Sequence, residues 1–171
     1  MSKNPMAAPA AAANPLARFT GALFGLAPIS LTTLVLRVAL ALPFLRAGQT
    51  DWDGWFDLSF GVKARFADLR LHWFGAEYPF PEPDLWALAA GVAEVGLPAL
   101  LIVGLGTRYA ALGLLVMTGV IQLTFPEGWA NFHLYWASLA LAIMTFRPGR
   151  IALDYVLGLD RVSRARRAAA S

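Results

Sequence analysis

Two ionisable side chains lie near the middle of long apolar segments, Arg37 in the first segment and Glu94 in the second. A charged group inside the hydrocarbon core of a bilayer is costly, so it needs a partner or a function. Arg37 lies about 10 Å from the N-terminal end of its segment, and Glu94 lies about 14 Å from the N-terminal end of its own. In antiparallel helices these two ends lie on opposite sides of the membrane. Across a hydrocarbon core about 30 Å thick, the two side chains therefore differ in depth by about 6 Å, which an arginine side chain can cover. The spacing therefore predicts a direct or water-bridged Arg37–Glu94 pair.

Pro98 adds to this predicted charge centre because it follows Glu94 by four residues. Proline has no amide hydrogen, so the backbone carbonyl of Glu94 would lose its helical donor. A carboxylate and a free carbonyl would then lie together near the middle of the membrane, where they can hold a cation, a proton or a guanidinium. Two interpretations stay open: the pair joins two helices, or it takes part in function.

A second group of polar and aromatic residues lies near the ends of the third and fourth apolar segments: Gln122, His133 and Trp136. One interpretation is a pocket that opens outward, with Glu94 at its floor, where a carboxylate accepts a hydrogen bond from a quinone and aromatic rings cover its apolar ring. The other is that these side chains anchor the helices at the membrane interface. We expect no cofactor, and a quinone is the one alternative that these residues leave open. With no cysteine and two histidines, the sequence predicts no metal site.

Four apolar segments position these residues, at 30–49, 85–105, 108–125 and 130–146. A helix needs roughly 20 mostly apolar residues to cross a bilayer, and each segment reaches or approaches that length. The chain is 58% hydrophobic and 15% charged, whereas a soluble domain is about 45–50% apolar and about 25% charged. The predicted fold is an all-α integral membrane four-helix bundle, occupying residues 30–149, with short amphipathic helices at the interface.

The remaining segments flank or interrupt the bundle. Residues 1–29 are predicted to be a disordered start followed by an interfacial helix, and residues 150–171 an amphipathic segment with a basic tail. The long loop at 50–84 ends in a proline-rich run, after which Asp84 is expected to cap the second membrane helix. A helical stripe within this loop predicts a short helix on the bundle or in the interface, formed by Leu58, Val62, Phe66, Leu69 and Trp73.

Charge predicts how the chain is oriented. Residues 50–83 carry six acidic and three basic side chains, whereas the arginines of the C-terminal tail follow the last apolar segment. Because basic residues favour the cytoplasmic side, both termini are expected in the cytoplasm and the long loop outside. The net charge of +3 therefore fits a protein of the bacterial inner (plasma) membrane, with the lipid bilayer rather than nucleic acid as its partner.

Several short patterns accompany the two charges. Glu94 is followed by Leu97-Pro98, a Gly104-x-Gly106-Thr107-Arg108 turn joins the second and third apolar segments, and Pro148-Gly149 precedes Leu153-Asp154. Together with Arg37, this arrangement resembles the DoxX family of small four-span bacterial membrane proteins, over about residues 32–154. The chain departs from the family pattern at two places: Asp51 stands where many members carry lysine, and Arg147 replaces the first glycine of a Gly-Pro-Gly.

The resemblance implies a membrane role rather than a particular reaction. The family is named for a link to quinone-coupled sulfur oxidation, and members work beside membrane redox, oxidative-stress or metal-stress systems. We therefore expect a non-catalytic component that depends on a membrane or periplasmic protein partner docking on the outward loop. The alternative is a small transporter or quinone-binding protein that uses the Arg37/Glu94 centre, as a homo-oligomer in the case of transport. If the protein is an enzyme, we expect a quinone-linked oxidoreductase subunit, and no catalytic residue is assigned.

Overall fold

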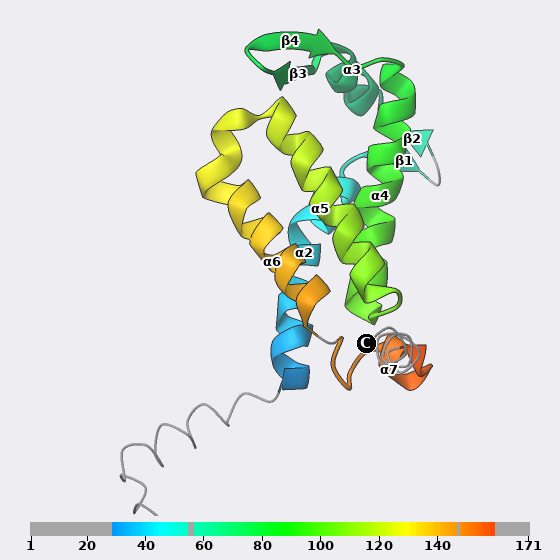
Figure 1. Ribbon diagram of the computed structural model, residues 1–171. Coiled ribbons are helices and arrows are strands. Elements are labelled where there is room, and N and C mark those ends of the chain that lie inside the picture. Colours follow the sequence, from blue (N-terminus) through cyan, green and yellow to red (C-terminus); the bar gives the residue numbers. More distant parts are fainter. Residues whose placement is uncertain (1–28, 55–56, 147, 160–171) are drawn as a thin grey trace, which may run out of the picture.

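The computed structural model describes residues 29–54, 57–146 and 148–159, and it is a mostly helical bundle (Figure 1). The predicted interfacial helix before residue 29 and the basic tail lie outside the described residues. The long helices are α2 (Ile29–Gln49), α4 (Pro83–Val103) and α5 (Thr107–Thr124). After a short 3-10 turn, η1 (Pro126–Gly128), the chain forms a π-helical turn, η2 (Trp129–His133), that runs directly into α6 (Leu134–Thr145). The predicted all-α membrane bundle is confirmed.

Length and apolar character distinguish two of these helices. Both α2 and α4 have 21 residues, with mean hydropathies of 1.6 and 1.9, and either could cross a membrane. α5 has 18 residues and α6 has 12. The interior between the helices is built from fully buried apolar side chains, among them Leu40, Leu101 and Leu114.

The helices pack as a closed ring, α2 against α4, α4 against α5, α5 against α6, and α6 back against α2. Two glycines allow close approach. A Cβ on Gly48 of α2 would lie 2.9 Å from the Cβ of Glu94, and one on Gly113 of α5 would lie 2.7 Å from Leu97. Such small residues are common where membrane helices cross closely.

Most of the segment between α2 and α4 covers one end of the bundle, called the outer end here, and its first hairpin lies beside the middle of α4 (Figure 1). It contains the β1 (Trp52–Gly54) and β2 (Asp57–Leu58) hairpin, helix α3 (Phe60–Asp68), and the β3 (Arg70–Trp73) and β4 (Ala76–Pro79) hairpin. The Ser59 side chain accepts a hydrogen bond from the Gly61 amide and so caps the start of α3.

Part of the predicted helical stripe packs as expected. Leu58, Val62 and Phe66 cluster with Ala87 of α4, so α3 lies on the bundle. The prediction was wrong beyond that point, because α3 ends at Asp68 and Trp73 belongs to a β-strand. Pairing with β4 supplies the backbone hydrogen bonds there, and it leaves Trp73 half-exposed.

The start of α4 also differs from the prediction. Pro83, not Asp84, occupies the first helical position, and Glu82 precedes it with a left-handed backbone (φ 47°) and no side-chain capping bond. Proline suits this first position because the amide it lacks would have no helical partner there. The short helix α7 (Leu153–Val156) lies at the opposite, inner end of the bundle.

Candidate functional site

The predicted Arg37–Glu94 pair is wrong, because the two side chains have different partners at different levels of the bundle. Arg37 is completely buried, and its Nη1 donates to the carbonyls of Leu101 and Ile102 at 3.4 and 3.5 Å. Its Nη2 donates to the Ile151 carbonyl at 3.0 Å. Arg37 therefore binds the end of α4 and the segment after α6.

The stagger between α2 and α4 explains the separation. Glu94 lies against Gly48, and Gly48 follows Arg37 by eleven residues, which is about 16 Å along a helix. The predicted Arg37–Glu94 pair depends on the ends of the two helices lying at the same levels. In the structure, α4 instead begins beyond α2, where it packs against α3, so its last turn rather than its middle lies beside Arg37.

Arg37 belongs to a structural cluster at the inner end that we call the inner clamp: Arg37, Gly104, Gly106, Thr107 and Asp154. The Asp154 carboxylate accepts hydrogen bonds from the amides of Gly106 and Thr107, at 2.7 and 2.9 Å. It also attracts Arg37 electrostatically. The cation thus binds carbonyls at the end of α4 and the anion binds amides at the start of α5, which matches the helix dipoles.

Gly104 makes this arrangement possible. Its backbone is left-handed (φ +79°), and a Cβ there would collide with Nη1 of Arg37 and lie 2.7 Å from the Cβ of Ala152. Arg108 follows in the first turn of α5 and is partly exposed, and Pro98 is fully buried inside α4. The Gly-x-Gly-Thr turn therefore has a structural role, as a place where three segments of the chain meet.

The Pro148-Gly149 pair completes the inner end. The Thr33 hydroxyl donates to the Pro148 carbonyl at 3.3 Å, and the Arg150 amide donates to the Ser30 hydroxyl at 3.1 Å. Gly149 has φ +84°, and a Cβ there would collide with the Thr33 hydroxyl. This turn therefore holds the chain after α6 against the start of α2.

In the middle of α4, Glu94 belongs to a group that we call the acid cluster: Asp51, Arg65 and Glu94. The Glu94 and Asp51 carboxyls lie within hydrogen-bonding reach of each other. Nη2 of Arg65 lies 3.4 Å from Oδ1 of Asp51. Oδ2 of Asp51 and Oε2 of Glu94 are buried and have no donor among the described residues. Two acids and one base therefore meet in a site largely shielded from water.

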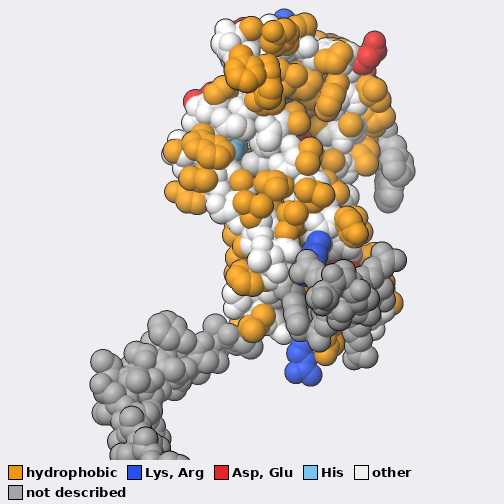
Figure 2. Space-filling view, in the orientation of Figure 1, with side chains coloured by type: hydrophobic (Ala, Val, Ile, Leu, Met, Phe, Trp, Pro, Cys, Tyr) orange, Lys and Arg blue, Asp and Glu red, His pale blue; other side chains and the backbone are white. Residues whose placement is uncertain are grey.

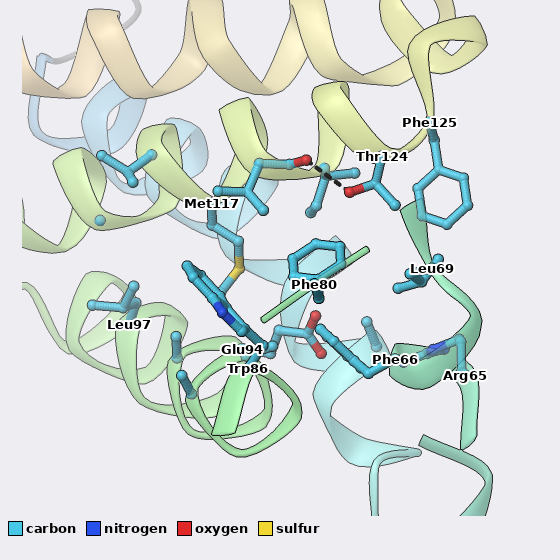
Figure 3. A pocket seen from close by; sticks show the side chains of 18 residues that line it. Arg65, Phe66, Leu69, Phe80, Trp86, Glu94, Leu97, Met117, Thr124 and Phe125 are labelled. Atoms are coloured by element: carbon cyan, nitrogen blue, oxygen red, sulfur yellow. Dashed lines mark hydrogen bonds between the residues drawn. The ribbon is translucent and has the colours of Figure 1, made fainter. Parts of the chain in front are cut away.

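Two members of the acid cluster, Arg65 and Glu94, line a cavity of about 380 Å³ between α4 and α5, beneath α3. Figure 3 shows the Glu94 carboxyl directed toward the rings of Phe66 and Phe80. Apart from Glu94, Arg65 and Thr124, the lining is apolar, and the Thr124 hydroxyl is satisfied by the Val120 carbonyl. The larger lining side chains are Phe66, Leu69, Phe80, Trp86, Leu97, Met117, Ile121 and Phe125.

The predicted pocket of Gln122, His133 and Trp136 is only partly right. His133 is buried, its Nδ1 lies 2.7 Å from the Gln122 amide oxygen, and its ring centre lies 5.5 Å from that of Trp136. These three side chains are therefore neighbours. None of them lines the Glu94 cavity, whose walls come mainly from α3, α4 and α5, together with Ala47 of α2, Leu69 and Phe80.

A family model described as DoxX matches residues 32–127, which is more than half of the chain. The chain belongs to the DoxX family. Comparison with curated proteins and with solved structures found no match. In this DoxX protein the matched segment contains Arg37, the whole acid cluster and every residue that lines the cavity, whereas Pro148 and Asp154 lie beyond it.

Sequence reasoning missed two members of the acid cluster in this DoxX protein, Asp51 and Arg65. The sequence places Asp51 only in the acidic segment 50–83 and gives it no partner, whereas Arg65 of α3 contacts it in the structure. The signal that could have found it is the departure at Asp51, where many DoxX members carry lysine. An acid at that position, only three residues after Gly48, brings a second carboxyl to Glu94.

Proposed function

We propose that this DoxX protein binds a lipid-soluble, ring-bearing ligand of the quinone class in the α4–α5 cavity and holds it for a partner in a redox or stress-response system. The observation that carries the proposal is a cavity with apolar and aromatic walls that ends at a carboxyl and a guanidinium. Binding a quinone for a partner requires no electron carrier within this chain, which has no cysteine.

The size and lining of the cavity support a ligand of this kind. Its volume of about 380 Å³ falls in the usual range for small-molecule sites, roughly 300–1,000 Å³. Phe80 contacts Phe66 and Trp86 edge to face, with ring centres 5.8 and 5.7 Å apart, which gives an aromatic wall for an apolar ring. Glu94 can accept a hydrogen bond from a ligand hydroxyl, and Arg65 can donate one to a ligand carbonyl.

The long axis of the cavity supports access from the lipid phase. Its α4 lining extends from Trp86 to Leu97, which is about 16 Å of helix. Both lining helices carry apolar side chains along this length. A quinone with an isoprenoid tail would therefore keep its tail among lipids while its ring lies beside Glu94.

The proposal includes an orientation in the inner membrane with four crossings, by α2, α4, α5 and the continuous η2–α6 helix, and with both termini in the cytoplasm. In Figure 2, the larger patches of Lys and Arg lie toward the inner end and the Asp and Glu patches toward the outer end, where some Lys or Arg colour also shows. Reporter fusions at Lys63 and at Ser171 should lie on opposite sides of the membrane. Fusions on the same side would refute this orientation.

The β3–β4 hairpin is the proposed docking surface for the partner protein. Its tip exposes Phe74 by 94% and Trp73 by 52%, and the two rings contact edge to face. A photo-crosslinker at Phe74 should capture a membrane or periplasmic protein in living cells. The matched control is Val156 of α7, which is 73% exposed at the inner end. Equal capture at both positions, or none at Phe74, would contradict partner docking there.

Quinone binding is tested by filling the cavity. Ala93 lines it, whereas Ala99 lies on the same helix outside it and is exposed. Ala93→Phe should weaken the binding of a short-chain ubiquinone analogue, measured by equilibrium dialysis, at least about tenfold, while Ala99→Phe should not. Unchanged binding in Ala93→Phe would refute the proposal. Movement of a solute by the purified protein in liposomes would favour the transporter alternative.

A further inference from the structure

The acid cluster contains more acid than its single base can balance. Asp51 is 98% buried, since only 2% of its surface is exposed, and the buried part of Glu94 lies against it. Each acid has one buried oxygen that meets no donor among the described residues. Two ionised carboxylates in contact repel strongly when water is excluded, so both cannot carry a full negative charge.

We propose that Asp51 and Glu94 share a single proton and form a proton-binding site at the wall of the cavity. The shared proton gives each buried carboxyl the hydrogen-bonding partner that it otherwise lacks. The remaining negative charge is balanced by Arg65, whose Nη2 lies 3.4 Å from Oδ1 of Asp51. The acid cluster as a whole is then neutral, which lowers the cost of placing it inside a membrane protein.

The groups around the pair support a proton rather than a metal ion. Among the described residues, the charges that act on Glu94 are those of Asp51 and Arg65. From α5, Thr124 is the polar side chain that lines the cavity, and it does not titrate. In the described part of the chain no three acidic or histidine side chains gather to hold a metal ion, and Arg65 already supplies the positive charge.

The site connects two environments. The Arg65 side chain is 53% exposed, whereas that of Asp51 is 3% exposed, and Glu94 lines the cavity. A proton can therefore pass between water on the Arg65 side and a ligand on the Glu94 side through the two carboxyls. The proton site itself stands without any ligand. Its use by a quinone rests on the function proposed above.

The test measures the proton directly, with the full-length protein in nanodiscs and no quinone added. Infrared spectra at neutral pH should show the carbonyl stretch of a buried protonated carboxylic acid, which shifts in D₂O. Glu94→Gln should abolish this band, because the proton-sharing pair is lost and Asp51 is left with Arg65 alone. Asp51→Asn should shift the band, because the Glu94 carboxyl loses its proton-sharing partner while it stays buried. Asp53→Asn, at an exposed acid outside the cluster, is the matched control and should keep the band.

Arg65→Gln provides a second measurement. Without the guanidinium the acid pair should hold its proton more tightly, so the midpoint at which the band disappears should move to higher pH. A band that survives in Glu94→Gln, that is unchanged in Asp51→Asn, or that is absent from the unaltered protein, would overturn the proposal. Loss of the band when sodium ions are added at constant pH would also overturn the proposal, since the two carboxyls would then bind a metal cation. Quinone binding is measured in a separate experiment, so a negative result for the proton site does not affect the test of quinone binding, and a negative result for quinone binding does not affect the test of the proton site.

Discussion

The inner clamp predicts that Arg37 is a structural residue whose removal destabilises the protein. Arg37→Met keeps much of the side-chain volume and removes the guanidinium, leaving the carbonyls of Leu101, Ile102 and Ile151 without this donor. A hydrogen bond to a charged group contributes about 1.5–3 kcal/mol. Only the bond to Ile151, at 3.0 Å, has a favourable length, since the other two measure 3.4 and 3.5 Å. We therefore expect a loss of about 2–4 kcal/mol, somewhat below the full cost of breaking a buried ion pair.

Double-mutant cycles distinguish this account from the pairing that the sequence predicted. Arg37→Met and Asp154→Asn act within one cluster and should show a coupling energy of about 0.5–3 kcal/mol. Arg37→Met and Glu94→Gln act at separate sites with no shared partner, so their effects should add to within about 0.5 kcal/mol.

The assay is reversible unfolding in detergent, followed by circular dichroism, which yields the free energy of unfolding for each variant. Arg46→Met is the matched control, because Arg46 lies on the same helix and is exposed, and it should leave stability almost unchanged. A coupling energy above about 1 kcal/mol between Arg37 and Glu94, or none between Arg37 and Asp154, would refute the reasoning.

Three further predictions use the same unfolding measurement. Gly104→Ala should destabilise the protein by about 1–3 kcal/mol, because Gly104 has a left-handed backbone and a Cβ there would collide with Arg37. The control is Gly96→Ala, in open space within α4, which should be neutral or stabilise the protein by up to about 1 kcal/mol. Gly48→Ala should cost about 1–3 kcal/mol, since its Cβ would force α2 away from α4, and no loss would refute the close crossing. Gln122→Leu should cost about 1–3 kcal/mol by leaving the buried His133 ring without its partner at 2.7 Å, and an unchanged free energy would count against that contact.

The sequence was sufficient for the family and for the helical membrane class because both depend on local patterns. Apolar runs and short turn motifs can be recognised within a few residues, as in the Gly104 turn, where a left-handed glycine ends α4. The importance of Arg37 was also visible, since a charge in an apolar segment must be satisfied somewhere.

The partners of these charges could not be read from the sequence, because they depend on how far one helix is shifted along another. That shift is set by Gly48 packing against Glu94 and by α3 occupying the outer part of α4. The β3–β4 hairpin was missed for a related reason. Its apolar residues continue the spacing of α3, and only backbone pairing between the strands places Trp73 away from the bundle.

The inner clamp also bears on how the protein is made. Arg37 enters the membrane with the first helix, but Ile151 and Asp154, which complete its surroundings, are among the last described residues to be synthesised. Until then a nascent chain carries a buried cation with part of its partners missing. A chain cut short before Ile151 keeps that defect, because its Arg37 lacks both the Ile151 carbonyl and the Asp154 charge. The stability that Arg37 gives to the first long helix is therefore complete only when the last described part of the chain has folded onto it.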